Sequence, residues 1–161
     1  MTDRELAVTA WESLFRAQVG VIRVLASEFP TRTMSLNEYD VLFNLSLQPE
    51  HRARLRDINQ LVLLSQPSVS RLIDRLVARG FVSKHPDPTD KRGTIVAITD
   101  AGFAQYRDVA RLHMGTITDL MGSALSDAEL RQLATLTAKL RGSNPDSQPD
   151  PPDDWLRDNP E

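Results

Sequence analysis

Residues 65–99 are the stretch that most limits what this chain can fold into. Its first half has the signals of a helix: Ser65 is a favourable N-cap, Pro67 suits the first turn, and Gly80 suits a left-handed C-terminal cap. Apolar residues recur between these signals at helical spacing, which predicts a buried underside made of Val69, Leu72, Ile73, Leu76 and Val77. The opposite face is predicted to be polar and to carry Gln66, Ser68, Ser70, Arg71, Asp74 and Arg75.

A β-hairpin is predicted directly after this helix. Segments 81–85 and 94–99 read as strands, and the turn between them contains Pro, Asp and Gly. A helix with a Ser/Arg face, followed by a hairpin with a basic tip, is typical of proteins that place the helix in the major groove of DNA. A solvated helix face would be the simpler interpretation of the helix taken alone.

Asp90 and Arg92 are the candidate pair at the hairpin tip. A basic side chain there can enter a minor groove, and a neighbouring carboxylate can hold its guanidinium group. The alternative is a polar turn in which Asp90 accepts hydrogen bonds from backbone N–H groups.

The charge distribution is compatible with a DNA-binding surface, although the net charge is −3. Residues 50–93 contain nine Lys and Arg against five Asp and Glu, and the rest of the chain is acidic. Salt screens exposed charges beyond about 10 Å, so the local charge governs attraction to phosphates. The acidic balance of the whole chain therefore does not exclude DNA.

Several classes of protein are excluded by what the sequence lacks. There is no cysteine, no apolar run near the length of a membrane span, and no signal-peptide pattern, so a cytoplasmic protein is expected. The histidines His51, His85 and His113 have no short ligand spacing, so no metal site is expected. Neither a Gly-rich phosphate loop nor HExxH or GxSxG is present, so we expect no catalytic residues and no cofactor.

The flanking segments predict further helices. Ser/Thr-x-x-Glu capping signals occur at Thr2/Glu5, Ser35/Glu38 and Ser126/Glu129, and Thr99-Asp100 reads as another cap. The helices are expected over residues 3–29, 36–47, 55–63, 100–121 and 127–140, with a loop over 48–54. The predicted fold is mainly α with a small β-hairpin wing, in the order α-α-α-α-β-β-α-α.

The first and last helices have more apolar surface than one small winged domain can cover. The first helix carries two rows spaced by seven, Leu14/Val21/Leu25 and Phe15/Ile22/Phe29. A second copy of the chain would cover such surface. We therefore expect a dimerisation helix at 3–34, a winged helix-turn-helix at 35–99, dimerisation helices at 100–141, and a disordered, acidic, Pro-rich tail at 142–161.

The sequence resembles the MarR (multiple antibiotic resistance regulator) family of transcriptional regulators. The resemblance spans residues 5–141 and is carried by Ser70-Arg71, Asp74, Leu76, Gly80, Val82, Asp90-x-Arg92, Ile98-Thr99 and Gly102. It implies a homodimer that binds a palindromic operator in double-stranded DNA, and we expect a repressor. The alternative from another class is a winged-helix protein–protein interaction module without operator specificity.

The resemblance also implies site residues. Ser65, Gln66, Ser68, Ser70 and Arg71 would contact the major groove, Arg75 a phosphate or a base, and Arg92 the minor groove with Asp90 orienting it. Lys91 and Lys84 complete the expected DNA contacts, but Lys84 stands where an Arg is common and lacks its planar fork.

Family members commonly bind small, often aromatic and anionic effectors in a crevice beside the winged domain. The candidate effector contacts here are Trp11, Arg16, Arg23, Tyr39, Asp40 and His113. For each of these residues the simpler alternative is a place in the core or on a solvated surface.

Overall fold

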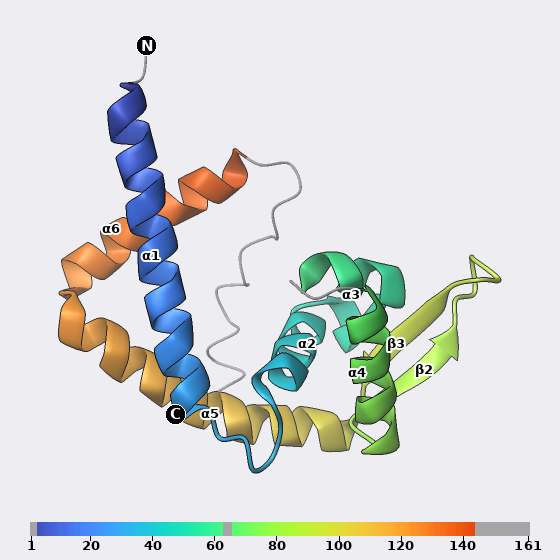
Figure 1. Cartoon of the computed structure of the whole chain (residues 1–161). Helices are drawn as coiled ribbons and strands as arrows, with labels where there is room; N and C mark the ends of the chain where they lie inside the picture. Colours follow the sequence, from blue (N-terminus) through green and yellow to red (C-terminus); the bar gives the residue numbers. More distant parts are fainter. Residues whose placement is uncertain (1–2, 63–65, 144–161) are drawn as a thin grey trace.

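The computed structural model describes residues 3–62 and 66–143. Its elements are α1 (Arg4–Glu28), α2 (Leu36–Ser46), the 3₁₀ turn η1 (Pro49–His51), β1 (Arg52–Arg54), α3 (Leu55–Leu61), α4 (Gln66–Ala78), β2 (Val82–Pro86), β3 (Thr94–Ile98), α5 (Asp100–Ala124) and α6 (Asp127–Gly142). Figure 1 shows α2 to β3 gathered into one body, while α1 and α6 lie beyond it along α5. The tail expected from residue 142 lies outside the described residues from 144 onward, and Gly142 itself ends α6.

Local capping signals position most of these helices as predicted. Ser35 and Glu38 form the expected capping box at the start of α2, Thr99 caps α5, and Gly80 after α4 has a left-handed φ of 74°. The start of α1 differs from the prediction, because Asp3 is its N-cap and accepts from the backbone N–H groups of Glu5 and Leu6. Thr2 lies outside the described residues.

The predicted loop over 48–54 was wrong, because it contains η1 and a third strand. Strand β1 pairs antiparallel with β3, which gives a sheet in the order β1-β3-β2. Glu50 and His51 both have left-handed φ values, 55° and 52°, and they turn the chain into β1. The local sequence of β1 carries no strand signal, since its partner in the ladder lies more than forty residues later.

The core lies under α4, where the sheet, α2, α3 and α5 meet. Val69, Leu72, Ile73 and Leu76 are fully buried there, as the spacing predicted, and Tyr106 of α5 is buried in the same cluster. Val77 is 38% exposed, so its predicted place on the buried face was wrong. The position of α4 is therefore fixed by its apolar face, and the opposite face is open.

The long apolar faces of α1 and α6 remain uncovered within one chain. In α1 only Leu25 is buried, followed by its C-cap Phe29, whereas Phe15 and Ile22 are 51% and 50% exposed. One chain alone thus does not bury the apolar rows of α1, in keeping with the expectation that a single winged domain cannot cover them. Other exposed apolar residues on these helices and α5 are Leu6, Val8, Trp11, Val24, Leu112, Leu133, Leu136 and Leu140. None of the helices in the described ranges has the length and apolar character needed to traverse a membrane.

Candidate nucleic-acid interface

The open face of α4 presents two arginines to solvent. Arg71 and Arg75 are exposed above buried Leu72 and Ile73, and neither side chain has an ion-pair partner within residues 3–62 and 66–143. Ser68 and Ser70 are half-buried on this helix, and Gln66 is its first residue. The predicted cap and DNA contact Ser65 lies outside the described residues. A rigid helix with free guanidinium groups is suited to phosphate and base-edge contacts.

Lys84, predicted as a DNA contact, has a partner inside the protein. Its Nζ lies 2.5 Å from Oδ1 of Asp74, which joins β2 to the exposed face of α4. Both side chains are at least partly exposed, so this ion pair stabilises little by itself. Its structural consequence is to set β2 against the polar side of the helix.

The turn between β2 and β3 places Lys91 and Arg92 at its tip. Both side chains are exposed, and neither has an ion-pair partner in the described part of the chain. Asp90 accepts a 3.0 Å hydrogen bond from the backbone N–H of Arg92, and its other oxygen lies 3.9 Å from Nη1 of Arg56. The carboxylate therefore orders the turn backbone rather than the Arg92 guanidinium, which corrects the predicted contact in favour of its alternative.

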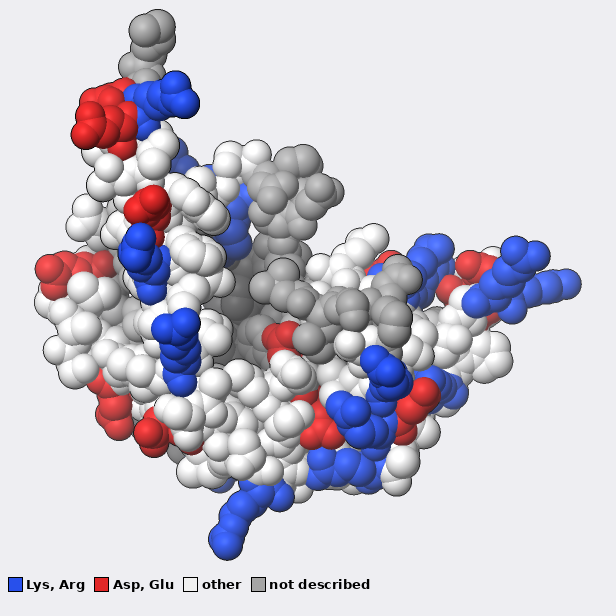
Figure 2. All heavy atoms as spheres, in the orientation of Figure 1, with Lys and Arg blue, Asp and Glu red and all other residues white. Residues whose placement is uncertain are grey.

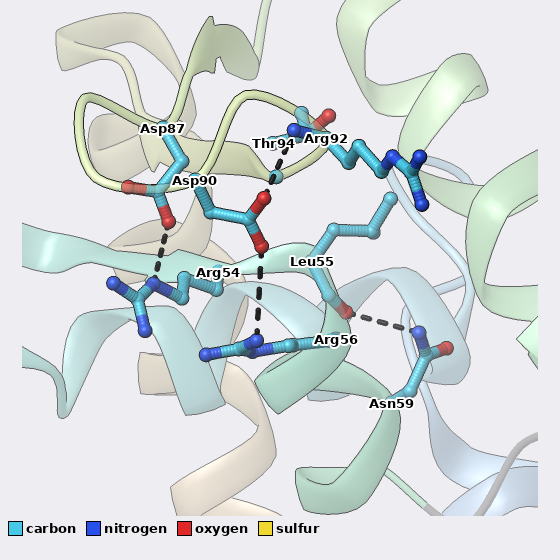
Figure 3. Close-up of a pocket in the computed structure, with 9 residues that line it drawn as sticks. Arg54, Leu55, Arg56, Asn59, Asp87, Asp90, Arg92 and Thr94 are labelled. Carbon is cyan, nitrogen blue, oxygen red and sulfur yellow. Dashed lines mark hydrogen bonds and ion pairs between the residues drawn. The ribbon is translucent and has the colours of Figure 1, made fainter.

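A hollow of about 260 Å³ lies between the base of this turn and the start of α3. Figure 3 shows Arg54, Arg56 and Asn59 on one side of it and residues of the turn on the other. The Nε of Arg54 lies 2.6 Å from Oδ2 of Asp87. Hydrogen bonds from the backbone and side chain of Thr89, together with Arg54, hold the pKa of the Asp87 carboxyl below its usual value.

The sequence did not indicate Arg54, Arg56 or Asp87 as site residues. Asp87-Pro88-Thr89 does have the pattern of an Asp that bonds backbone two residues on, which is a usable turn signal. The partner Arg54 had no such signal, because it lies on a different strand far away in sequence.

Arg79, which the sequence also did not indicate, joins α4 to the segment before α2. Its guanidinium hydrogen-bonds to Glu38 at 3.3 Å and to the carbonyl oxygen of Thr33, and it stacks 4.5 Å from the ring centroid of Phe81. Burial alone would raise the pKa of Glu38, but hydrogen bonds from Ser35, with Arg79, lower it overall. The carboxylate is thus held ionised between the two elements.

The basic groups are gathered where these elements are exposed. Figure 2 shows Lys and Arg at the outer end of the wing, formed by β2, β3 and their turn, and around the body that holds α4, with acidic groups among them. The visible face of α1 also carries acidic and basic groups along its length.

Two aromatic candidates for effector binding meet where α1 ends. The ring of His113 on α5 lies 5.2 Å from those of Tyr39 and Phe29. His113 is 8% exposed, and its Nδ1 is buried with no hydrogen-bond partner among the described residues. Burial lowers the pKa of His113 and raises the pKa of Tyr39.

Asp40, the third candidate on α2 and α5, is half-buried beside this aromatic group. Burial raises the pKa of its carboxyl, partly opposed by a 3.2 Å hydrogen bond from Asn44.

The α1 candidates are not brought to the same place. Trp11 is 61% exposed and stacks on Phe15, and exposed Arg16 pairs with Glu12 at 3.6 Å. Because a helix rises about 1.5 Å per residue, Trp11 and Arg16 lie about 20 Å or more from the α1 end at Phe29. Arg23 is exposed less than two turns from that end. Among the described residues, no group of three or more potential metal ligands is close enough to hold an ion.

Residues 32–93, which include α2, the recognition-type helix α4, strand β2 and the wing turn, match the MarR family. The chain belongs to this family. PecS of Dickeya dadantii, a helix-turn-helix transcriptional regulator, is 28% identical over 130 residues, which are 80% of this chain and 77% of PecS. This MarR-family protein is thus a DNA-binding transcriptional regulator, not an enzyme, as the sequence predicted.

Solved structures confirm the predicted winged helix-turn-helix with its C-terminal helices. Sco3205 of Streptomyces coelicolor, a MarR-family regulator in complex with DNA, superposes with a TM-score of 0.73 at 22% identity over 98% of both chains. BpsR of Bordetella bronchiseptica, whose DNA binding is regulated by 6-hydroxynicotinic acid, gives a TM-score of 0.70 at 23% identity, covering 82% of this chain and 98% of BpsR.

Proposed function

We propose that this regulator is a homodimer that binds a palindromic operator and represses transcription in the cytoplasm. The observation that carries the proposal is the pair of exposed arginines, Arg71 and Arg75, on a helix whose opposite face packs into the core. At the outer end of the wing, Arg92 projects from an ordered turn with no partner of its own in the described chain. In this arrangement α4 enters a major groove and the wing tip reaches the adjacent minor groove.

The dimer is supported by the uncovered apolar faces of α1 and α6. Contiguous exposed apolar surface of this kind marks an interaction site on a soluble domain. A second copy supplies a matching face, and its two-fold axis would place two α4 helices on half-sites about one DNA turn apart. The symmetry of the operator then follows from the symmetry of the protein.

The proposed effector is a small aromatic molecule bound where Tyr39 and His113 meet. The buried Nδ1 of His113 is a hydrogen-bonding group without a partner in the described chain, and the rings of Phe29 and Tyr39 provide an apolar wall. BpsR, whose DNA binding responds to 6-hydroxynicotinic acid, supports this ligand class. Trp11 and Arg16 would reach such an effector only from the second protomer. The effector would lower DNA affinity by favouring a dimer whose α4 helices are wrongly spaced.

The test is binding to a palindromic duplex that the parent protein has selected from a random pool, titrated against salt. Arg71→Ala and Arg92→Ala should each weaken specific binding by about 1–3 kcal/mol and leave the dimer intact in sedimentation equilibrium. Arg131→Ala on α6 removes the same charge from an exposed side chain that pairs with Asp127, and it should bind like the parent. If both first variants bind like the parent, or if binding lacks a steep salt dependence, the proposed interface is wrong.

A further inference from the structure

Arg54, Asp87 and Thr89 form a closed set of contacts at the root of the wing, which we name the wing clasp. Oδ2 of Asp87 lies 2.6 Å from Nε of Arg54, and the Asp87 side chain is only 1% exposed. Oδ1 of Asp87 accepts from the backbone N–H and from the hydroxyl of Thr89, both at 2.8 Å. Nη2 of Arg54 in turn donates to the Thr89 hydroxyl oxygen at 2.8 Å.

The clasp joins the wing turn to strand β1 across a separation of 35 residues. Figure 3 shows Arg54 reaching from below the turn to Asp87, while Arg92 points away on the far side. The backbone N–H of Asp87 donates to the carbonyl of Gly93, and that of Gly93 donates to the carbonyl of Asp90. The clasp therefore fixes the two ends of the segment that carries Arg92.

The two ends of the turn are packed closely together beside the clasp. A Cβ at Gly93 would lie 2.7 Å from Cβ of Asp87, so the two ends of the turn are already in close contact. The Arg92 side chain has no ion pair or hydrogen bond of its own in the described chain. Its position relative to α4 is set through the backbone alone.

We propose that Arg54 and Asp87 are positioning residues for DNA binding, acting through the turn on Arg92. This inference rests on the proposed function, in which the wing tip contacts DNA. The Arg54 guanidinium is committed to Asp87 and Thr89, and its side chain is 36% exposed, so its first role is within the protein. A direct phosphate contact by Arg54 is the competing interpretation.

The sign of the charge separates positioning from simple electrostatics. Asp87 is an acidic group beside a surface that meets phosphates, so its removal should strengthen DNA binding if only charge mattered. Positioning predicts the reverse, because neutral Asn holds Arg54 less strongly and frees the turn. The low pKa of Asp87 is consistent with a carboxylate that remains charged in this contact.

The experiment measures dissociation constants for the selected palindromic duplex, with Asp87→Asn introduced into the parent and into Arg92→Ala. In the parent, Asp87→Asn should weaken binding about tenfold, the size of one lost Arg contact. In the Arg92→Ala background the same change should cost almost nothing, because the group it positions is gone. Asp57→Asn, which removes an exposed acid at the start of α3, should bind as well as or better than the parent.

Circular dichroism melting checks that each variant is folded. If Asp87→Asn does not fold, Arg54→Met provides the same comparison. It should cause the same loss of DNA affinity in the parent and no further loss in the Arg92→Ala background. The proposal is overturned if Asp87→Asn binds as tightly as the parent, or if the loss persists in the Arg92→Ala background. Absence of specific binding by the parent protein would instead refute the proposed function.

Discussion

Replacing Gly102 by Ala should loosen the joint between the winged body and α5. Gly102 is buried in the first turn of α5, and a Cβ there would lie 1.9 Å from the carbonyl oxygen of Phe81. The obstacle is backbone, so no side chain can rotate away from it. To reach even 3.0 Å, the start of α5 must move about 1.1 Å away from Phe81.

The expected loss of stability follows from the contacts that this movement would weaken. The Phe81 oxygen accepts a 3.1 Å hydrogen bond from the Thr99 backbone N–H, and the Thr99 hydroxyl accepts one of 3.0 Å from the Gly102 N–H. Overpacking costs about 1–3 kcal/mol, and weakening the cap and one buried hydrogen bond adds about 1 kcal/mol each. We expect Gly102→Ala to lower the free energy of unfolding by about 3–5 kcal/mol.

Urea unfolding followed by circular dichroism measures this loss, at one fixed protomer concentration because a dimer's stability depends on it. Gly115→Ala is the matched control, since it lies on the same helix and a Cβ there meets nothing within 4 Å. The free energy of unfolding of this control should equal that of the parent or exceed it by up to about 1 kcal/mol. If the free energy of unfolding of Gly102→Ala lies within about 1 kcal/mol of the parent value, the close backbone contact between Gly102 and Phe81 does not hold α5 to the winged body.

Two further experiments test contacts around α2. Because burial lowers the pKa of His113 in the folded state, unfolding takes up a proton as the pH falls below the ordinary value of 6.5. Stability should therefore be complete above that pH and decline below it by at most about 1.4 kcal/mol per unit, and His113→Phe should remove this part of the slope in urea melts. The Arg79–Glu38 contact should give a coupling of about 0.5–2 kcal/mol in a double-mutant cycle of Arg79→Met and Glu38→Gln. A coupling within error of zero would show that the two elements are held by apolar packing alone.

The sequence predicted those parts of the fold that depend on neighbouring residues. The buried face of α4 followed from the spacing of Val69, Leu72, Ile73 and Leu76, because helical periodicity is a local property. The Ser35 capping box and the left-handed Gly80 followed for the same reason. The prediction for Val77 was wrong because this residue lies at the edge of the apolar face of α4, where a small rotation of the helix decides between core and solvent.

Contacts between distant segments could not be predicted in this way. Strand β1 has only three residues, and its hydrogen bonds depend on β3. The clasp partners lie far apart in sequence, Arg54 at the end of β1 and Asp87 directly after β2, and no local signal connects them. The wing tip was therefore predicted, whereas the contacts that hold the wing in place were not.

The apolar rows of α1 show a different limit of sequence patterns. Phe15 and Ile22 have the spacing of a buried face, yet half of each side chain is exposed in the single chain. Periodicity reports that a face is covered, without saying whether the same chain covers it. The exposure of these rows in one chain therefore supports the proposed second protomer.

The two contacts at the ends of the winged body constrain how an effector could act. Arg79 holds the end of α4 to Thr33 and Glu38, and the Gly102 contact holds the start of α5 to Phe81. An effector beside His113 would press on α2 and α5, which these contacts tie to the recognition helix. Under the proposed function, α4 would therefore move together with the whole winged body relative to the dimerisation helices α1 and α6. The spacing between the two α4 helices of the dimer would then change, while each winged body keeps its internal contacts.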